Sequence, residues 1–137
     1  MGELKNFEEK IMGTVHRFKG KEGEFDWENI PIESYDSSEM KGVTKRVLIG
    51  KREKAPYFVM RYFEIEPGGW TSFDKHPHDH GVIILKGKGK VLLGNEEIEV
   101  GFGDAVYVPP NETHQFKNNG AEIFGFICVI PNKELVH

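Results

Sequence analysis

Three of the six histidines of this chain fall within five consecutive positions, at His76, His78 and His80. Neutral imidazole is the commonest side-chain ligand of transition metals, and Asp74, two residues before the first of them, adds a carboxylate oxygen. A single extended strand would spread residues 74–80 over roughly 20 Å. Ligands of one ion lie only about 2.0 to 2.2 Å from it. The chain must therefore reverse within this stretch if these side chains share an ion.

A turn between His76 and His80 would bring their imidazoles together. The proline and the aspartate within this segment are residue types that favour turns. On this interpretation Asp74 and His76 leave one strand on the same side, and His80 opens the next strand facing back at them. His78 then lies at the tip of the turn, where we expect it to be exposed to solvent or to line a pocket rather than to bind the ion.

Short strands separated by turn residues are the expected structure from residue 43 onward. The segments are rich in β-branched and aromatic residues and are bounded by Gly, Pro and Asn. No helical period of comparable strength competes with them. Regular short strands of this kind indicate an antiparallel sandwich or barrel, a class that includes the jelly rolls. The expected strands cover residues 43–49, 57–66, 82–85, 91–93, 97–100, 105–108, 114–117 and 122–130.

Alternation within the segment 57–66 predicts which side chains face the interior. Glu64 and Glu66 mark the solvent side, so Arg61 and Phe63 are expected on the inner side. An arginine facing a barrel interior has two interpretations. Arg61 either lies near the rim, where it extends its charged end to solvent or pairs with an acid, or it binds a carboxylate of a substrate.

The stretch 68–118 resembles the two sequence motifs of the cupin superfamily. The first motif is matched by Gly68, Asp74, His76, His80 and Gly87. The second motif is matched by Gly103, Pro109, His114 and Asn118. Asp74 stands where the family usually has its first histidine, and Asn111 replaces a loop glycine whose left-handed conformation asparagine tolerates.

The resemblance implies an all-β fold, the antiparallel double-stranded β-helix of the cupin jelly-roll barrel. It also implies that His76, His80 and His114 bind one divalent transition metal ion, which is Fe, Mn, Ni or Zn. Asp74 is either a fourth ligand or a hydrogen-bonding partner of a ligand histidine. No general base separate from the ligands is obvious. Glu112 beside His114 is one candidate for this role, and Asp74 is another if it does not bind the ion.

Cupins with similar sites include dioxygenases, oxalate-processing enzymes, sugar isomerases and decarboxylases. The resemblance therefore implies a metal-dependent enzyme with a small organic molecule as substrate. We expect a dioxygenase-like oxidoreductase with a site of three histidines and one carboxylate. The alternatives are a cupin isomerase or decarboxylase, and a non-catalytic cupin that uses the same ion to bind or sense a small molecule.

The size and charge of the chain exclude several classes of partner. The 137 residues suit one domain, and the net charge of −4 without a basic block argues against nucleic acid or an anionic membrane surface. No apolar run is long enough to span a membrane, and the start of the chain does not read as a signal peptide, so we expect a cytoplasmic protein.

The single cysteine, Cys128, lies in an apolar run and is expected to be a small buried hydrophobe rather than a nucleophile.

We expect two regions within this single chain. Residues 41–137 form the barrel, and residues 1–40 form an N-terminal arm with short edge strands. Because unpaired strand edges invite association, such an arm covers an open sheet edge or reaches a second subunit. The chain is therefore expected to form a homodimer.

Overall fold

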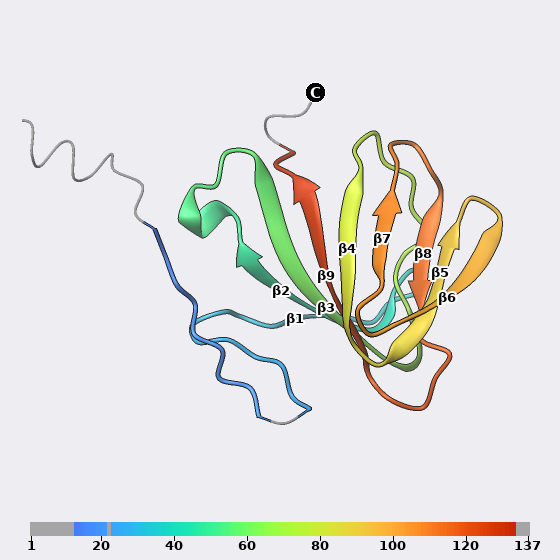
Figure 1. Cartoon of the computed structure of the whole chain (residues 1–137), viewed down its shortest axis with the longest axis horizontal. Coiled ribbons are helices and arrows are strands. Elements are labelled where there is room, and N and C mark those ends of the chain that lie inside the picture. The colour runs from blue at the N-terminus through green and yellow to red at the C-terminus, as the bar shows by residue number, and fades with distance from the viewer. Residues whose placement is uncertain (1–12, 22, 134–137) are drawn as a thin grey trace, which may run out of the picture.

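The computed structural model describes residues 13–21 and 23–133 of the chain. In this part the chain forms nine strands and a single short 3-10 turn, with no α-helix (Figure 1). The all-β prediction is confirmed, and the expected strands agree with the observed ones to within a few residues. The elements are β1 (Glu33–Tyr35), β2 (Lys41–Ile49), the 3-10 turn η1 (Lys51–Glu53), β3 (Phe58–Trp70), β4 (His80–Lys86), β5 (Lys88–Leu93), β6 (Glu96–Gly101), β7 (Ala105–Val108), β8 (His114–Lys117) and β9 (Phe124–Pro131).

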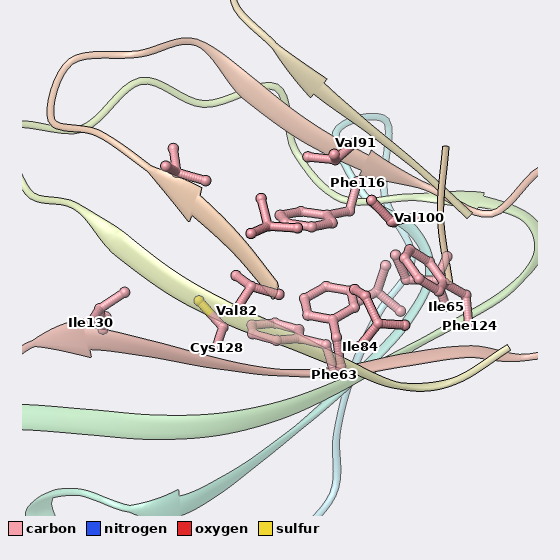
Figure 2. Close-up of a cluster of buried hydrophobic side chains, with 14 residues drawn as sticks. Phe63, Ile65, Val82, Ile84, Val91, Val100, Phe116, Phe124, Cys128 and Ile130 are labelled. Atoms are coloured by element: carbon pink, nitrogen blue, oxygen red, sulfur yellow. The ribbon is translucent and has the colours of Figure 1, made fainter. Parts of the chain in front are cut away.

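The strands pair in one curled antiparallel sheet. Its order is β6-β5-β8-β3-β9-β4-β7, and β2 pairs with β3 while β1 extends β2. Strand β3 holds the sheet together, because it pairs with β9 over eight residues but meets β8 only at Trp70 and Lys117. The sheet bends at that narrow junction, so that the β5 and β8 side chains face those of β3 and β9 (Figure 2).

Aromatic side chains fill the space between the two halves of the sheet. The rings of Phe116 on β8 and Phe126 on β9 stack with their centroids 4.5 Å apart, and Phe126 also stacks on Phe63 of β3 at 5.5 Å. Figure 2 shows Val91 and Phe116 on one side of this core and Phe63 and Cys128 on the other. Burial of these apolar side chains is the main stabilising contribution to the barrel.

The outer face of β3 differs from the expectation, because part of it does not meet solvent. Tyr62 is fully buried, and the rings of Phe25 and Trp27 lie 5.4 Å and 5.3 Å from its ring. Glu66 is exposed as expected, but Glu64 is only half-buried and accepts a hydrogen bond from the Tyr62 hydroxyl at 2.8 Å. The segment before β1 covers this face, and alternation within one strand cannot predict such a cover.

The described part of the expected arm, from residue 13 onward, therefore packs on the barrel of its own chain. Strand β1 lies within it and extends the sheet edge at β2. Residues 1–12 of the arm lie outside the described residues, and the homodimer remains a prediction. Within residues 13–21 and 23–133, no helix has the length and apolar character needed to cross a membrane.

An ion pair fastens this covering segment to the sheet. Arg46 on β2 is buried, and its Nε donates a hydrogen bond to Asp26 Oδ1 at 3.1 Å. Burial raises the pKa of the Asp26 carboxyl, but hydrogen bonds from Arg46 and from the backbone N–H of Trp27 outweigh it and hold the pKa below its usual range. Replacement of this aspartate would leave a buried guanidinium without its counterion.

We expect Asp26→Asn to lower the free energy of unfolding by about 1 kcal/mol, since the carboxylate is partly exposed and the pair is partly screened. The contribution is present at pH values above the unfolded pKa of about 3.9 and is lost as the pH falls through the lower folded pKa. Urea denaturation at pH 7 and at pH 3 measures both effects. Asp36→Asn, at an exposed position, is the control and should leave stability unchanged; equal stability of the two variants at pH 7 contradicts the prediction.

Candidate metal centre

Three histidines from separate backbone segments converge at one end of the barrel. His80 is the first residue of β4, His114 is the first residue of β8, and His76 lies in the loop between β3 and β4. One donor atom from each of the three lies within 4.8 Å of the other two. Nitrogen donors this close can share a single ion with bonds of about 2.0 to 2.1 Å. The structure thus brings together the three histidines that the motifs single out.

Backbone hydrogen bonds hold the two loops that carry these histidines. Asp74 and His114 exchange both backbone hydrogen bonds, at 3.0 Å and 2.9 Å, so the loop after β3 runs alongside the start of β8. The backbone N–H of Asn111 donates to the His76 carbonyl at 2.6 Å. Asn111 has a φ of 65°, the left-handed conformation that asparagine tolerates in place of the glycine of the cupin motif. The positions of His76 and His114 are therefore fixed relative to each other by the main chain.

The imidazoles are held with donor atoms free for a ligand. His114 Nδ1 lies 3.0 Å from the backbone carbonyl oxygen of Glu112, which orients the ring and leaves Nε2 available. His80 Nδ1 lies 3.4 Å from Cys128 Sγ, and His80 Nε2 is buried without a hydrogen-bond partner among the described residues. A buried nitrogen left unpaired costs free energy, and coordination of a metal ion would satisfy it. The residues present fit a metal ion.

The protonation of the cluster also suits metal binding. Burial and, to a smaller extent, the nearby His114 together lower the pKa of His80 to about 3. Burial likewise lowers the pKa of His76, against the opposing effect of the Asp74 carboxylate. Both imidazoles are therefore neutral near pH 7, and the neutral form is the one that offers a lone pair to a cation.

His78 does not occupy the exposed turn tip that the sequence suggested. Its side chain is buried, and its ring stacks on that of His76 with centroids 5.0 Å apart and an interplanar angle of 5°. It also lies 4.9 Å from the His80 ring, yet it is not one of the three residues whose donor atoms converge. The loop folds inward here, so His78 packs beside the cluster and supports the His76 ring.

Asp74 lies beside the histidine cluster rather than within it. Its Oδ2 is 3.6 Å from His76 Nε2, and it accepts a hydrogen bond from the Ser72 hydroxyl. The group of convergent donor atoms consists of the three histidines alone among the described residues. We therefore propose that Asp74 lies beside a ligand histidine and does not bind the ion directly.

We expect Asp74→Asn to weaken binding of Mn²⁺ or Zn²⁺ by about tenfold, the lower end of what loss of an outer partner of a ligand costs, since its carboxylate lies 3.6 Å from His76 Nε2 without a direct hydrogen bond. The substitution keeps the shape of the side chain and removes its charge. Isothermal titration calorimetry on the metal-free protein measures the change. Ser72→Ala is a matched control that removes the hydroxyl partner of Asp74 and should have a smaller effect. A loss for Asp74→Asn as large as that for a ligand histidine would show that Asp74 binds the ion directly.

The histidine cluster opens into a cavity of about 240 Å³. Its lining combines the aromatic side chains of Phe63, Phe116 and Phe126 with polar and charged side chains around the histidines, and the arm contributes Tyr35 and Met40. Apolar walls with convergent polar groups are typical of small-molecule sites, and this volume suits a small ligand. The barrel thus places the three imidazoles against a cavity rather than against a closed core.

Arg61 lines the same cavity, on the inner side that strand alternation predicted. Its Nη2 donates to Cys128 Sγ at 3.0 Å, and its guanidinium lies 4.9 Å from the centroid of the Phe63 ring. Its Nε is buried without a hydrogen-bond partner, and no carboxylate within the described part of the chain forms an ion pair with it. Of the two sequence interpretations, pairing with an acid is the one that the structure does not support.

Glu112 contributes through its backbone rather than its carboxylate. Its carbonyl oxygen orients His114, whereas its side chain is directed towards Gly94, in the turn between β5 and β6. It is not among the described residues that line the cavity. The proposal that Glu112 acts as a general base therefore gains no support from the geometry.

Cys128 is buried, as the sequence suggested, but it also lies between two polar groups of the site. Burial raises the pKa of its thiol, against the opposing effect of Arg61. The contacts with Arg61 and His80 arise because Cys128 pairs with Arg61 of β3 on one side and Val82 of β4 on the other. The sequence does not show which strands pair with one another, so these contacts were not predicted.

The family model described as "Cupin domain" matches residues 61–130, from near the start of β3 almost to the end of β9. The chain belongs to the cupin family. This cupin is 32% identical to the 1-methylthio-D-xylulose 5-phosphate methylsulfurylase of Rhodospirillum rubrum over 116 residues, which cover 82% of the chain and 73% of that protein.

Solved structures agree with the family assignment. A cupin-2 domain protein of Rhodospirillum rubrum is 31% identical to this cupin, with a TM-score of 0.74 and coverage of 83% of this chain and 77% of that one. The polyketide cyclase RemF of Streptomyces resistomycificus is 29% identical, with a TM-score of 0.73 and coverage of 88% and 79%. The fold predicted from the two motifs is confirmed.

Proposed function

We propose that this cupin is a metal-dependent enzyme that acts on a small organic molecule, with one ion held by His76, His80 and His114. The observation that carries the proposal is the buried, partnerless Nε2 of His80, which belongs to a cluster that opens into a cavity. A bound Fe, Mn, Ni or Zn ion would supply Lewis-acid polarisation and, where the metal is redox-active, electron transfer.

The residues of the chain itself would hold and orient the reactants. The backbone carbonyl of Glu112 orients the His114 imidazole, and the carboxylate of Asp74 lies 3.6 Å from Nε2 of His76. The aromatic walls from Phe63, Phe116 and Phe126 exclude bulk water, which strengthens the electrostatic interactions inside the cavity. Three protein donors are fewer than a transition ion accepts, so a donor atom of a substrate has room to bind.

A dioxygenase-like oxidation is the first reaction that we propose, since three imidazoles suit redox-active ions and aromatic side chains line part of the cavity. The second candidate is chemistry at the carbonyl group of a phosphorylated sugar. The relative from Rhodospirillum rubrum favours it, because its name specifies 1-methylthio-D-xylulose 5-phosphate as substrate and the similarity covers most of both chains. Cationic side chains of the cavity favour it as well, since Lys45, Arg61 and Lys133 all line it.

The deciding experiment compares the metal-loaded protein with metal-free protein and with His76→Ala. Oxygen consumption is measured with flavonoids, diketones and small carboxylic acids, and turnover of 1-methylthio-D-xylulose 5-phosphate is followed by phosphorus NMR. We expect metal-dependent turnover in one arm, lost in His76→Ala and kept in His16→Ala, a control for removal of a histidine outside the cluster. No turnover in either arm by protein with an occupied site would instead support the non-catalytic binding cupin.

A further inference from the structure

Two arginines lie on neighbouring strands of this cupin, and only one of them has a carboxylate partner among the described residues. Arg46 on β2 points to the outer face, where it pairs with Asp26 at 3.1 Å. Arg61 on β3 points to the inner face, where no described carboxylate pairs with it and its Nε has no hydrogen-bond partner. A half-buried guanidinium without a counterion is destabilising unless an anion binds to it.

The charge of the cavity lining also indicates that an anion binds here. Lys45, Arg61 and Lys133 contribute three cationic side chains to its lining, and Asp74 contributes the one carboxylate. Lys45 is partly neutralised by Glu33, whose Oε1 lies 3.7 Å from its Nζ. The protein as a whole carries a net charge of −4, so this excess of positive charge is local to the cavity. Such a site attracts anions of low molecular weight.

The unpaired guanidinium also lies close to the histidine cluster. Arg61 Nη2 is 3.0 Å from Cys128 Sγ, and the same sulfur atom is 3.4 Å from His80 Nδ1. One sulfur atom therefore separates Arg61 from an imidazole of the candidate metal site. A molecule a few bonds long can place one end at Arg61 and another at the histidines.

We propose that Arg61 is a specificity-determining residue that binds an anionic group, a phosphate or a carboxylate, of the small molecule that enters the cavity. A guanidinium suits both groups, because its planar N–H donors match two oxygens of either anion. That this small molecule is a substrate rests on the proposed enzymatic function, whereas the proposed anion site rests on the contacts of Arg61 alone. Lys45 and Lys133 add long-range attraction.

The test uses the full-length protein stripped of metal, so that an ion cannot bind the anion. Inorganic phosphate and malonate serve as separate probes at constant ionic strength, and their dissociation constants are measured by isothermal titration calorimetry. We expect saturable binding of at least one probe, weakened on the order of tenfold to a hundredfold by Arg61→Met, since hydrogen bonds to charged groups are of that strength. The probe bound more tightly identifies the anionic group.

Two further variants separate a specific site from general charge effects and from damage to the fold. Arg17→Met removes an exposed arginine and should leave both dissociation constants unchanged. Arg61→Lys keeps the positive charge but lacks the planar N–H donors of a guanidinium. Its affinity for the anion should therefore fall between those of the wild type and Arg61→Met. Removal of an unpaired cation should raise the melting temperature by about 3 °C, which also shows that Arg61→Met folds.

Unchanged affinity in Arg61→Met, or an equal loss in Arg17→Met, would overturn the proposal. A fall in melting temperature for Arg61→Met with unchanged anion binding would show that Arg61 serves the fold instead. The metal site is tested separately: His76→Ala should abolish metal binding and leave phosphate binding intact. Failure of the chain to bind any metal would therefore remove the proposed function without deciding the anion site.

Discussion

Replacement of His80 by alanine is expected to weaken transition-metal binding by more than about a hundredfold. Loss of an outer partner of a ligand typically costs tenfold to a hundredfold, and loss of the ligand itself costs more. His80 is the most constrained of the three histidines, because it is buried and its Nε2 has no other partner in the described structure. Titration of metal-free protein with Mn²⁺ and Zn²⁺, followed by calorimetry, measures the loss.

His78→Ala is the matched control for this prediction. It removes a neighbouring buried imidazole that stacks on His76 but lies outside the convergent group. We expect its metal affinity to fall less than tenfold, because the donors remain and only the support of one ring is lost. Equal losses in the two variants would show that the cluster does not distinguish His78 from His80. Full affinity in His80→Ala would show that these histidines do not form a metal site.

Replacement of Phe126 by alanine is expected to lower the free energy of unfolding by about 3 to 5 kcal/mol. The side chain is 2% exposed, and its ring lies 4.5 Å from Phe116, 5.5 Å from Phe63 and 5.4 Å from Phe124. These contacts join the two halves of the sheet, so truncation leaves a void that both halves line. Small domains have a total stability of about 5 to 15 kcal/mol, and a large part of it would be lost.

Denaturant unfolding of Phe126→Ala beside Phe102→Ala measures this effect. Phe102 is 77% exposed, so its truncation should change stability by no more than about 0.5 kcal/mol. Phe126→Leu should cost less than Phe126→Ala because it fills more of the void. A loss below about 1 kcal/mol for Phe126→Ala would mean that the two halves of the sheet are not packed through this ring.

Much of the barrel and part of the site follow from local sequence. Strands were predicted because β-branched and aromatic residues alternate between turn residues, and β4 begins at His80 as the reversal required. Asn111 adopts the left-handed conformation that asparagine was expected to tolerate in place of the motif's glycine. The partnership of His76 and His80 with the distant His114 came from the cupin resemblance rather than from alternation.

The sequence by itself determined which residue types offer donors, which segments form strands, and that Arg61 faces the interior. Only the tertiary structure decided that Cys128 lies between Arg61 and His80, that His78 is buried, and that the arm covers Tyr62. The reason is physical: alternation and turns depend on neighbouring residues, whereas these contacts depend on which distant strands pair and in what register. Pairing of β3 with β9 places an unpaired guanidinium in a cavity, and no property of residue 61 alone predicts the absence of its counterion.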